Sequence, residues 1–276
     1  MMLTRLASAL ARAAIVLAVV LVPAILLPQT RTDTAMMVAL VGLAAAAFTF
    51  LEYFGKSPSL LEFRDAPPFN RLRIGALGLT VLCLTLVLQN DAAPNTLTRL
   101  VASVGAELGR AIDFPFSPVR LVLLMMPDQT SPAALEVVRT AAGMSYLISL
   151  LMLGSFVLAL RLRDWPTRTR VFNFWINLPT IDPTQGGDVV ARLHRDAQMN
   201  LIAGFLLPFL IPAFVKLAWA FVDPLALTDP HTLIWTMTAW AFLPASLLMR
   251  GIALNRVADM ITAQRQVGRE RGFATA

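Results

Sequence analysis

Apolar residues gather in six uninterrupted stretches along the chain, and none of the six contains a charged residue. Each stretch is 17 to 21 residues long. An α-helix rises about 1.5 Å per residue, so a run of this length can cross the roughly 30 Å hydrocarbon core of a bilayer. The pattern therefore predicts six transmembrane helices. Their ranges are residues 13–30, 34–51, 74–90, 140–160, 197–215 and 232–249.

Composition supports the same fold class. Apolar residues make up 57% of the chain and charged residues only 14%, against about 25% charged residues in a typical soluble domain. The six stretches and their connections use nearly all of the 276 residues, which leaves little room for a separate soluble domain. We therefore predict an all-α, polytopic integral membrane helix bundle, organised as a single membrane domain over residues 1–276.

Basic residues alternate between the loops in a way that predicts the orientation. If the six spans are real, 17 of the 23 Lys and Arg residues lie on the side of the termini and five on the other. Because Lys and Arg near span ends are retained in the cytoplasm, both termini should be cytoplasmic. The Arg- and Ala-rich composition suggests a bacterial source, so the expected location is the cytoplasmic (inner) membrane. A cleavable signal peptide is the alternative for residues 13–30, but the expected cleavage site is missing, which favours retention.

The long loop on the non-cytoplasmic side contains a second kind of helix. Apolar residues recur there at spacings of three and four, with polar residues between them, and Asn95 or Thr96 is a suitable N-cap. This predicts an amphipathic helix near residues 96–113 that lies flat at the membrane interface. Residues 119–126 follow, an apolar run too short to span the bilayer. The run is either a surface element, which we favour, or a re-entrant segment.

Residues 161–198 form the largest predicted cytoplasmic loop, and it begins with a basic cluster. Clustered cations beside a membrane attract anionic lipid head groups. We therefore predict that the cluster contacts anionic lipids; the alternative, compatible with this, is that the arginines only fix the topology. The candidate lipid-contacting residues are Arg161, Arg163, Arg168 and Arg170.

An aromatic segment follows the basic cluster. Phe172, Phe174 and Trp175 lie within an uncharged run, which is unusual for a solvated loop. We expect the bundle, lipid or a partner protein to shield these three side chains. The next residues form a turn rich in Asp, Pro and Gly, after which Asp188 can cap a helix that continues into the fifth span.

Few polar or helix-perturbing residues lie within the spans. Lys216 is flanked by long apolar sequence and is the candidate intramembrane charge, although snorkelling to the nearby interface is favoured.

Pro208, Pro212 and Pro244 should kink the fifth and sixth spans, and kinked helices can line a transport path. Small surfaces for close helix packing are expected at four glycines. These are Gly75, Gly78, Gly143 and Gly154.

The chain carries no recognisable catalytic, cofactor or metal motif. Cys83 is the lone cysteine, and the two histidines are expected on opposite sides of the membrane. We therefore predict no cofactor and no nucleic-acid partner. The favoured function is a non-enzymatic accessory, scaffold or assembly subunit that docks other membrane subunits or lipids, and the alternative is a small-solute or lipid transporter. An enzyme acting on lipid-linked substrates would have to use Asp182, Asp188, His194 and Arg195.

Overall fold

The computed structural model describes residues 2–28, 30–163, 165–166, 172–181, 187–219, 227 and 229–274, and all their side chains except those of 163 and 268–274. Regular structure in these ranges is entirely α-helical, which confirms the predicted fold class. The helices of the described ranges are α1 (Met2–Leu26), α2 (Thr32–Phe54), α3 (Phe69–Ala92), α4 (Thr96–Ile112), α5 (Pro118–Met125), α6 (Pro132–Arg163), α7 (Phe174–Asn177), α8 (Val189–Ala218) and α9 (Pro230–Ala274).

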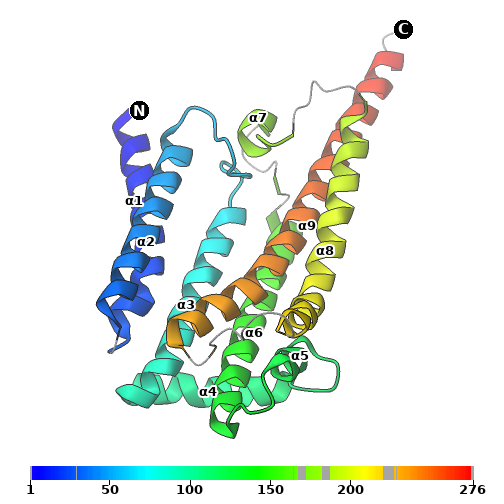
Figure 1. Cartoon of the computed structure of the whole chain (residues 1–276). Helices are drawn as coiled ribbons and strands as arrows, with labels where there is room; N and C mark the ends of the chain where they lie inside the picture. Colours follow the sequence, from blue (N-terminus) through cyan, green and yellow to red (C-terminus); the bar gives the residue numbers. More distant parts are fainter. Residues whose placement is uncertain are drawn as a thin grey trace.

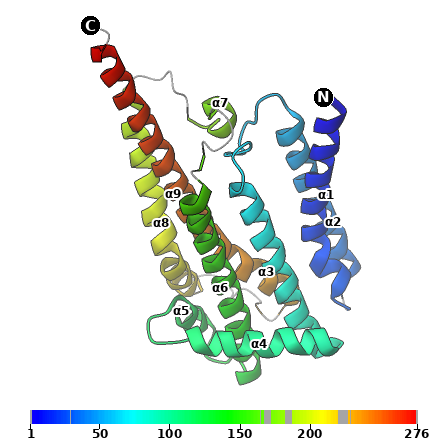
Figure 2. The ribbon, with the colours of Figure 1, turned by 180° about the vertical axis from the view of Figure 1, so that it is seen from behind.

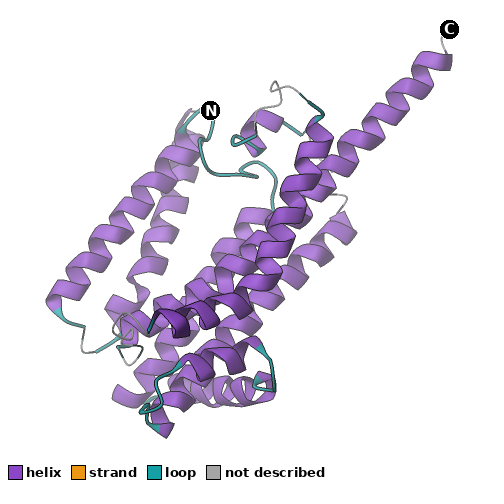
Figure 3. Ribbon diagram, turned by 45° about the vertical axis from the view of Figure 1, so that its right-hand side comes forward, coloured by secondary structure: helices purple, strands orange, loops and turns teal. Residues whose placement is uncertain are grey.

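Six of these helices, α1, α2, α3, α6, α8 and α9, are long and apolar enough to cross a membrane. They run between two ends of the molecule (Figure 1). The start of α1 and the end of α9 lie at one end, called here the terminal end, and α4 and α5 lie at the other, called here the α4 end (Figure 1). The helices extend beyond the charge-free stretches. α9 is the longest at 45 residues, or about 67 Å, and it projects past the other helices at the terminal end (Figure 3).

Helix α4 lies across the ends of the long helices rather than along them (Figure 2). Asn95 begins it as predicted: its Oδ1 accepts the Thr98 N–H at 3.0 Å, and Thr98 Oγ1 accepts the Asn95 N–H at 2.8 Å. Two α4 glycines then let the helix approach α6 closely. A Cβ built on Gly143 of α6 would lie only 2.5 Å from Gly109 Cα. The two backbones are therefore in direct contact.

The side chains of α4 separate into three faces. Thr98, Gly105 and Gly109 are buried against the bundle. Leu97, Leu100 and Val104 are exposed and apolar, and Arg99, Ser103, Glu107 and Arg110 are exposed and polar. A helix at a membrane interface needs one face for the protein, one for the acyl chains and one for water, so this pattern fits the interfacial position predicted for it.

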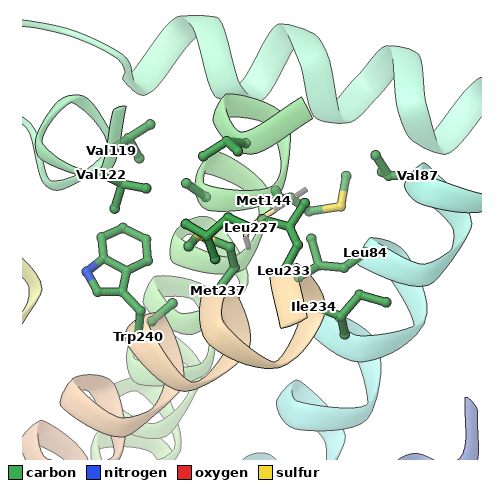
Figure 4. Close-up of a cluster of buried hydrophobic side chains, with 14 of the residues drawn as sticks. Leu84, Val87, Val119, Val122, Met144, Leu227, Leu233, Ile234, Met237 and Trp240 are labelled. Carbon is green, nitrogen blue, oxygen red and sulfur yellow. The ribbon is translucent and has the colours of Figure 1, made fainter. Parts of the chain in front are cut away.

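The core has two parts. The first is at the α4 end, where side chains of α3, α5, α6 and α9 meet around Met144, Met237 and Trp240 (Figure 4). The second is at the terminal end, where Phe63, Phe69, Phe156 and Trp165 form a set of ring contacts with centroids 4.6 to 5.6 Å apart. These clusters fix α3, α6, α8 and α9 as one packed bundle.

Helices α1 and α2 form a hairpin beside this bundle. α2 packs mainly against α1, and α1 packs against α3. Gly42 of α2 lies over Leu17 of α1, and Gly78 of α3 lies close to Val19 of α1. Most of the apolar surface of α2 is exposed. The hairpin is thus attached to the bundle along one side only. A cavity lies between the hairpin and the bundle.

Candidate functional site

A cavity of about 560 Å³ lies between the α1–α2 hairpin and the bundle. This volume is typical of small-molecule sites in proteins. Helix α3 and the hairpin supply most of the lining, and Leu61 of the α2–α3 loop and Phe242 of α9 complete it. The remaining lining residues are Ser8, Ala11, Arg12, Ile15 and Val16 of α1, Thr49 and Tyr53 of α2, and Asn70, Arg71, Arg73, Ile74 and Leu77 of α3.

The cavity is polar toward the terminal end and apolar toward the middle of the bundle. Helices α1 and α3 both start at the terminal end, so Arg12 and Arg73 lie nearer that end than Ile15 and Leu77 do. Tyr53, close to the end of α2, lies at the same polar level. The cavity can therefore accommodate a ligand with a polar head and an apolar tail.

The arginines of the cavity have no acidic partners. Among the residues that the structure describes, no carboxylate oxygen lies within 4.0 Å of the guanidinium nitrogens of Arg12, Arg71 or Arg73. The Arg12 guanidinium donates to Ser8 O at 3.1 Å and stacks 4.4 Å from the centroid of the Tyr53 ring. These contacts fix its plane but leave its charge uncompensated.

Arg73 is held by aromatic rings. Its guanidinium carbon lies 5.4 Å from the centroid of Phe69 and 5.9 Å from that of Phe242. Its Nε is buried and has no hydrogen-bond partner among the residues that the structure describes. A buried donor without a partner is costly and rare in proteins, which makes Arg73 unusual among the residues that line the cavity.

The carboxylates closest to the cavity are already engaged. Glu62 binds Arg250 through two hydrogen bonds of 2.6 and 2.8 Å and accepts a third at 2.6 Å from Thr180 Oγ1. Glu52 accepts the backbone N–H groups of residues 59–61 at 2.8 to 3.2 Å. Both acids are thus held by other groups, and in the described part of the chain neither lies within 4.0 Å of the guanidinium nitrogens of Arg12, Arg71 or Arg73.

The α2–α3 loop, residues 55–68, contributes Leu61 to the lining of the cavity. Phe63 adopts φ 52°, a left-handed conformation that costs a non-glycine residue about 1–2 kcal/mol. Burial of its ring and a 2.7 Å hydrogen bond from its N–H to Asn177 O stabilise this conformation. The buried Asn177 side chain also accepts the Asp65 N–H at 3.0 Å. The loop is thereby tied to α7, a link between distant segments that the sequence analysis did not identify.

At the α4 end, by contrast, Arg110, Arg120 and Arg139 have acidic partners. Asp113 lies 2.8 Å from Arg120 and 2.9 Å from Arg139, and its side chain is almost fully buried. Arg110 lies 3.1 Å from Glu136 of α6. These pairs tie α4, α5 and α6 together. Within the described residues, these three arginines differ from Arg12, Arg71 and Arg73 of the cavity in having a carboxylate within 4.0 Å.

The predicted lipid-contacting and partner-contacting residues lie outside the cavity. Arg161 is exposed at the end of α6, whereas the side chain of Arg163 and the whole of Arg168 and Arg170 are outside the described residues. Phe172 and Phe174 pack against the aromatic cluster of the terminal end. Trp175 on α7 is 58% exposed. The predicted shielding of Trp175 would therefore have to come from lipid or a partner.

Lys216 has a structural contact that the sequence did not indicate. Its Nζ donates to Leu124 O at 2.6 Å, in the last turn of α5. A cation beside the free carbonyl groups of a helix C-terminus is favourable. Lys216 thus links α8 to α5 while its side chain stays exposed. Whether it snorkels to an interface stays a prediction.

The region of the kinks in α8 and α9 is tightly packed. Trp240 Nε1 donates to Pro208 O at 3.1 Å, and a Cβ built on Gly204 would lie 2.7 Å from Pro244 O. Pro208, Pro212 and Pro244 do not line the cavity between the hairpin and the bundle. Pro208 and Pro244 therefore lie at close contacts between α8 and α9.

The candidate residues for an enzyme have separate partners. Asp188 caps α8 and lies 2.8 Å from Arg265, and hydrogen bonds from the Arg265 side chain and the Val190 N–H lower the pKa of its carboxyl. His194 Nδ1 contacts Asn255 Oδ1 at 3.2 Å. Asp182 lies outside the described residues. The described residues contain no group of three or more His, Cys, Asp or Glu side chains that could hold a metal ion.

The cavity can bind an anion through its arginines and an apolar chain through its deeper walls. Its lining, as far as the described residues form it, contains no Asp, Glu, His or Cys that could act as a general base or a thiol nucleophile. No protein-family model, no curated protein and no solved structure matches the chain. The geometry of the cavity is therefore the basis for the function proposed below.

Proposed function

We propose that this protein is a non-enzymatic accessory protein of a bacterial cytoplasmic membrane and that it docks an anionic lipid in the cavity between the α1–α2 hairpin and the bundle. The observation that carries the proposal is the set of three arginines without acidic partners, placed directly above apolar walls. Arginine binds phosphate and carboxylate groups through a planar set of N–H donors and is less strongly hydrated than lysine. A lipid would satisfy both halves of the cavity at once.

The proposed orientation has both termini in the cytoplasm. The excess of Lys and Arg on the side of the termini supports it, 17 residues against five. The polar part of the cavity would then lie at the cytoplasmic head-group layer, where anionic lipids are concentrated. Reporter fusions after residues 228 and 276 test this: we expect only the second to report a cytoplasmic position, and a cytoplasmic signal after residue 228 would contradict it.

A bound lipid would also suit a scaffold or assembly role. The lipid would fill the space between the α1–α2 hairpin and the bundle, which otherwise meet mainly where α1 packs against α3. It would thereby hold the exposed face of α2 in a fixed position, where other membrane subunits could bind. A transporter that uses α8 and α9 is the alternative proposal. The close contact of Gly204 with Pro244 gives it less support than the cavity gives lipid docking.

Lipid titration of the purified, delipidated protein followed by native mass spectrometry tests lipid docking. We expect anionic phospholipids to bind in preference to zwitterionic ones. The double variant Arg12→Gln/Arg73→Gln should lose this preference. Arg99→Gln is the matched control, because it removes an exposed charge on α4 far along the chain from the cavity. Equal binding of anionic lipid by the wild type and the double variant would overturn the proposal.

A further inference from the structure

We infer that the lipid docked in this cavity carries a phosphate monoester as its head group. The inference rests on the proposed function and narrows its ligand. A phosphate monoester carries a charge of about −1.5 to −2 at neutral pH, whereas phosphodiester and single-carboxylate head groups carry about −1. Among the described residues, the lining of the cavity offers three guanidinium groups and no acidic side chain, so a ligand with two negative charges matches its charge better than a ligand with one.

The number of acceptor oxygens supports the same choice. Each guanidinium presents a fork of N–H donors that can bind two oxygens at once. A monoester has three non-ester oxygens and a diester has two. Arg12 comes from the hairpin and Arg73 from the bundle, so the ligand must present acceptors in two directions. Three oxygens allow Arg12 and Arg73 each to bind two oxygens of the same phosphate group.

The neutral polar groups of the cavity contribute few donors. The Asn70 amide nitrogen already donates to Glu62 O at 2.8 Å and to Phe63 O at 3.2 Å. The Thr49 hydroxyl donates to Ala45 O at 2.8 Å. Asn70 and Thr49 therefore have no free donor for an uncharged or sugar-like head group. A phosphate bound by the cavity arginines therefore fits the site better than an uncharged head group does.

The apolar half of the cavity favours a lipid over a free phosphate. Ile15, Val16, Ile74, Leu77 and Phe242 line it. Burying an acyl chain against these side chains contributes about 25 cal/mol per Å² of apolar surface. A soluble phosphate monoester would leave this surface unused. It should therefore bind far more weakly than the lipid.

Equilibrium titration of the full chain in detergent tests the inference with four short-chain or soluble probes: phosphatidic acid, phosphatidylglycerol, phosphatidylcholine and glycerol phosphate. At about pH 8 we expect phosphatidic acid to bind at least about ten-fold more tightly than phosphatidylglycerol, the change that one additional hydrogen bond between charged groups produces. At about pH 5, below the second pKa of a phosphate monoester near 6, this difference should shrink toward none.

The outcomes separate the inference from the proposed function. Equal affinities for phosphatidic acid and phosphatidylglycerol, both reduced in Arg12→Gln/Arg73→Gln, would overturn the monoester assignment and leave lipid docking intact. Anionic and zwitterionic lipids binding alike would overturn both. Glycerol phosphate binding as tightly as phosphatidic acid would also overturn the assignment, because the acyl chain would then contribute nothing.

Discussion

The contact between α4 and α6 gives the most quantitative prediction, because two glycines of α6 differ only in their surroundings. A Cβ at Gly143 would lie 2.5 Å from Gly109 Cα and 3.1 Å from Gly109 N. Both are backbone atoms, so no side-chain rotation can relieve the clash. A Cβ at Gly154 would have no atom within 4 Å. The two Gly→Ala variants should therefore behave in opposite ways.

The magnitudes follow from two opposing effects. Replacing Gly by Ala within a helix gains up to about 1 kcal/mol from helix propensity. Overpacking a tight contact typically costs about 1 to 3 kcal/mol, and a clash between backbones belongs at the upper part of that range. Gly143→Ala should therefore lower the free energy of unfolding by about 1 to 2 kcal/mol, and Gly154→Ala should raise it by up to about 1 kcal/mol.

Reversible unfolding of the purified variants in mixed micelles measures these changes, and hydrogen exchange locates them. Gly143→Ala should increase amide exchange in α4 near Gly109, whereas Gly154→Ala should not. If the two variants unfold at the same denaturant concentration and α4 keeps its protection in both, then α4 does not lie against α6 as described.

Three further predictions concern the ends of the bundle. Lys216→Met should speed amide exchange in α5 and lower stability by about 0.5 to 1.5 kcal/mol through loss of one exposed hydrogen bond; unchanged exchange in α5 would refute the contact with Leu124. Asn177→Ala leaves the Asp65 N–H without its acceptor and should loosen the α2–α3 loop at a cost of about 1 to 3 kcal/mol, and a loop as protected as in the wild type would count against this. With Trp175 as the single tryptophan, brominated lipids should quench its fluorescence if a membrane shields it, whereas full quenching by aqueous iodide would rule out shielding.

The long helices could be predicted from the sequence because the ability to span a bilayer depends only on the consecutive residues of the helix itself. A helix must be apolar over about 20 residues, whatever its neighbours are. The same holds for α4, whose spacing and Asn95 cap are local signals. Packing at glycines is not local: Gly78 and Gly143 make the close contacts expected of them, whereas Gly75 and Gly154 have no atom within 4 Å of a built Cβ. Which glycine meets a helix depends on how the helices are arranged.

The cavity could not be predicted for the same reason. In the sequence, Arg12 and Arg73 resemble other basic residues beside the spans and were counted only toward the topology. Their distinction is that both line the cavity, and the nearby Glu62 binds Arg250, 188 positions away in the chain. Nothing in the local sequence indicates that pairing. Conversely, the aromatic run at 172–175 was conspicuous in the sequence, yet two of its three rings serve the core of the terminal end.

Photo-cross-linking with an anionic phospholipid that carries a reactive group in its acyl chain tests the central claim most directly. In native-like membranes, cross-links should concentrate on Ile15, Ile74 and Leu77 of the cavity and should fall sharply in Arg12→Gln/Arg73→Gln but not in Arg99→Gln. Cross-links spread over the exposed face of α2, at the same level in all three proteins, would mean that the lipid only surrounds the protein and does not occupy the cavity.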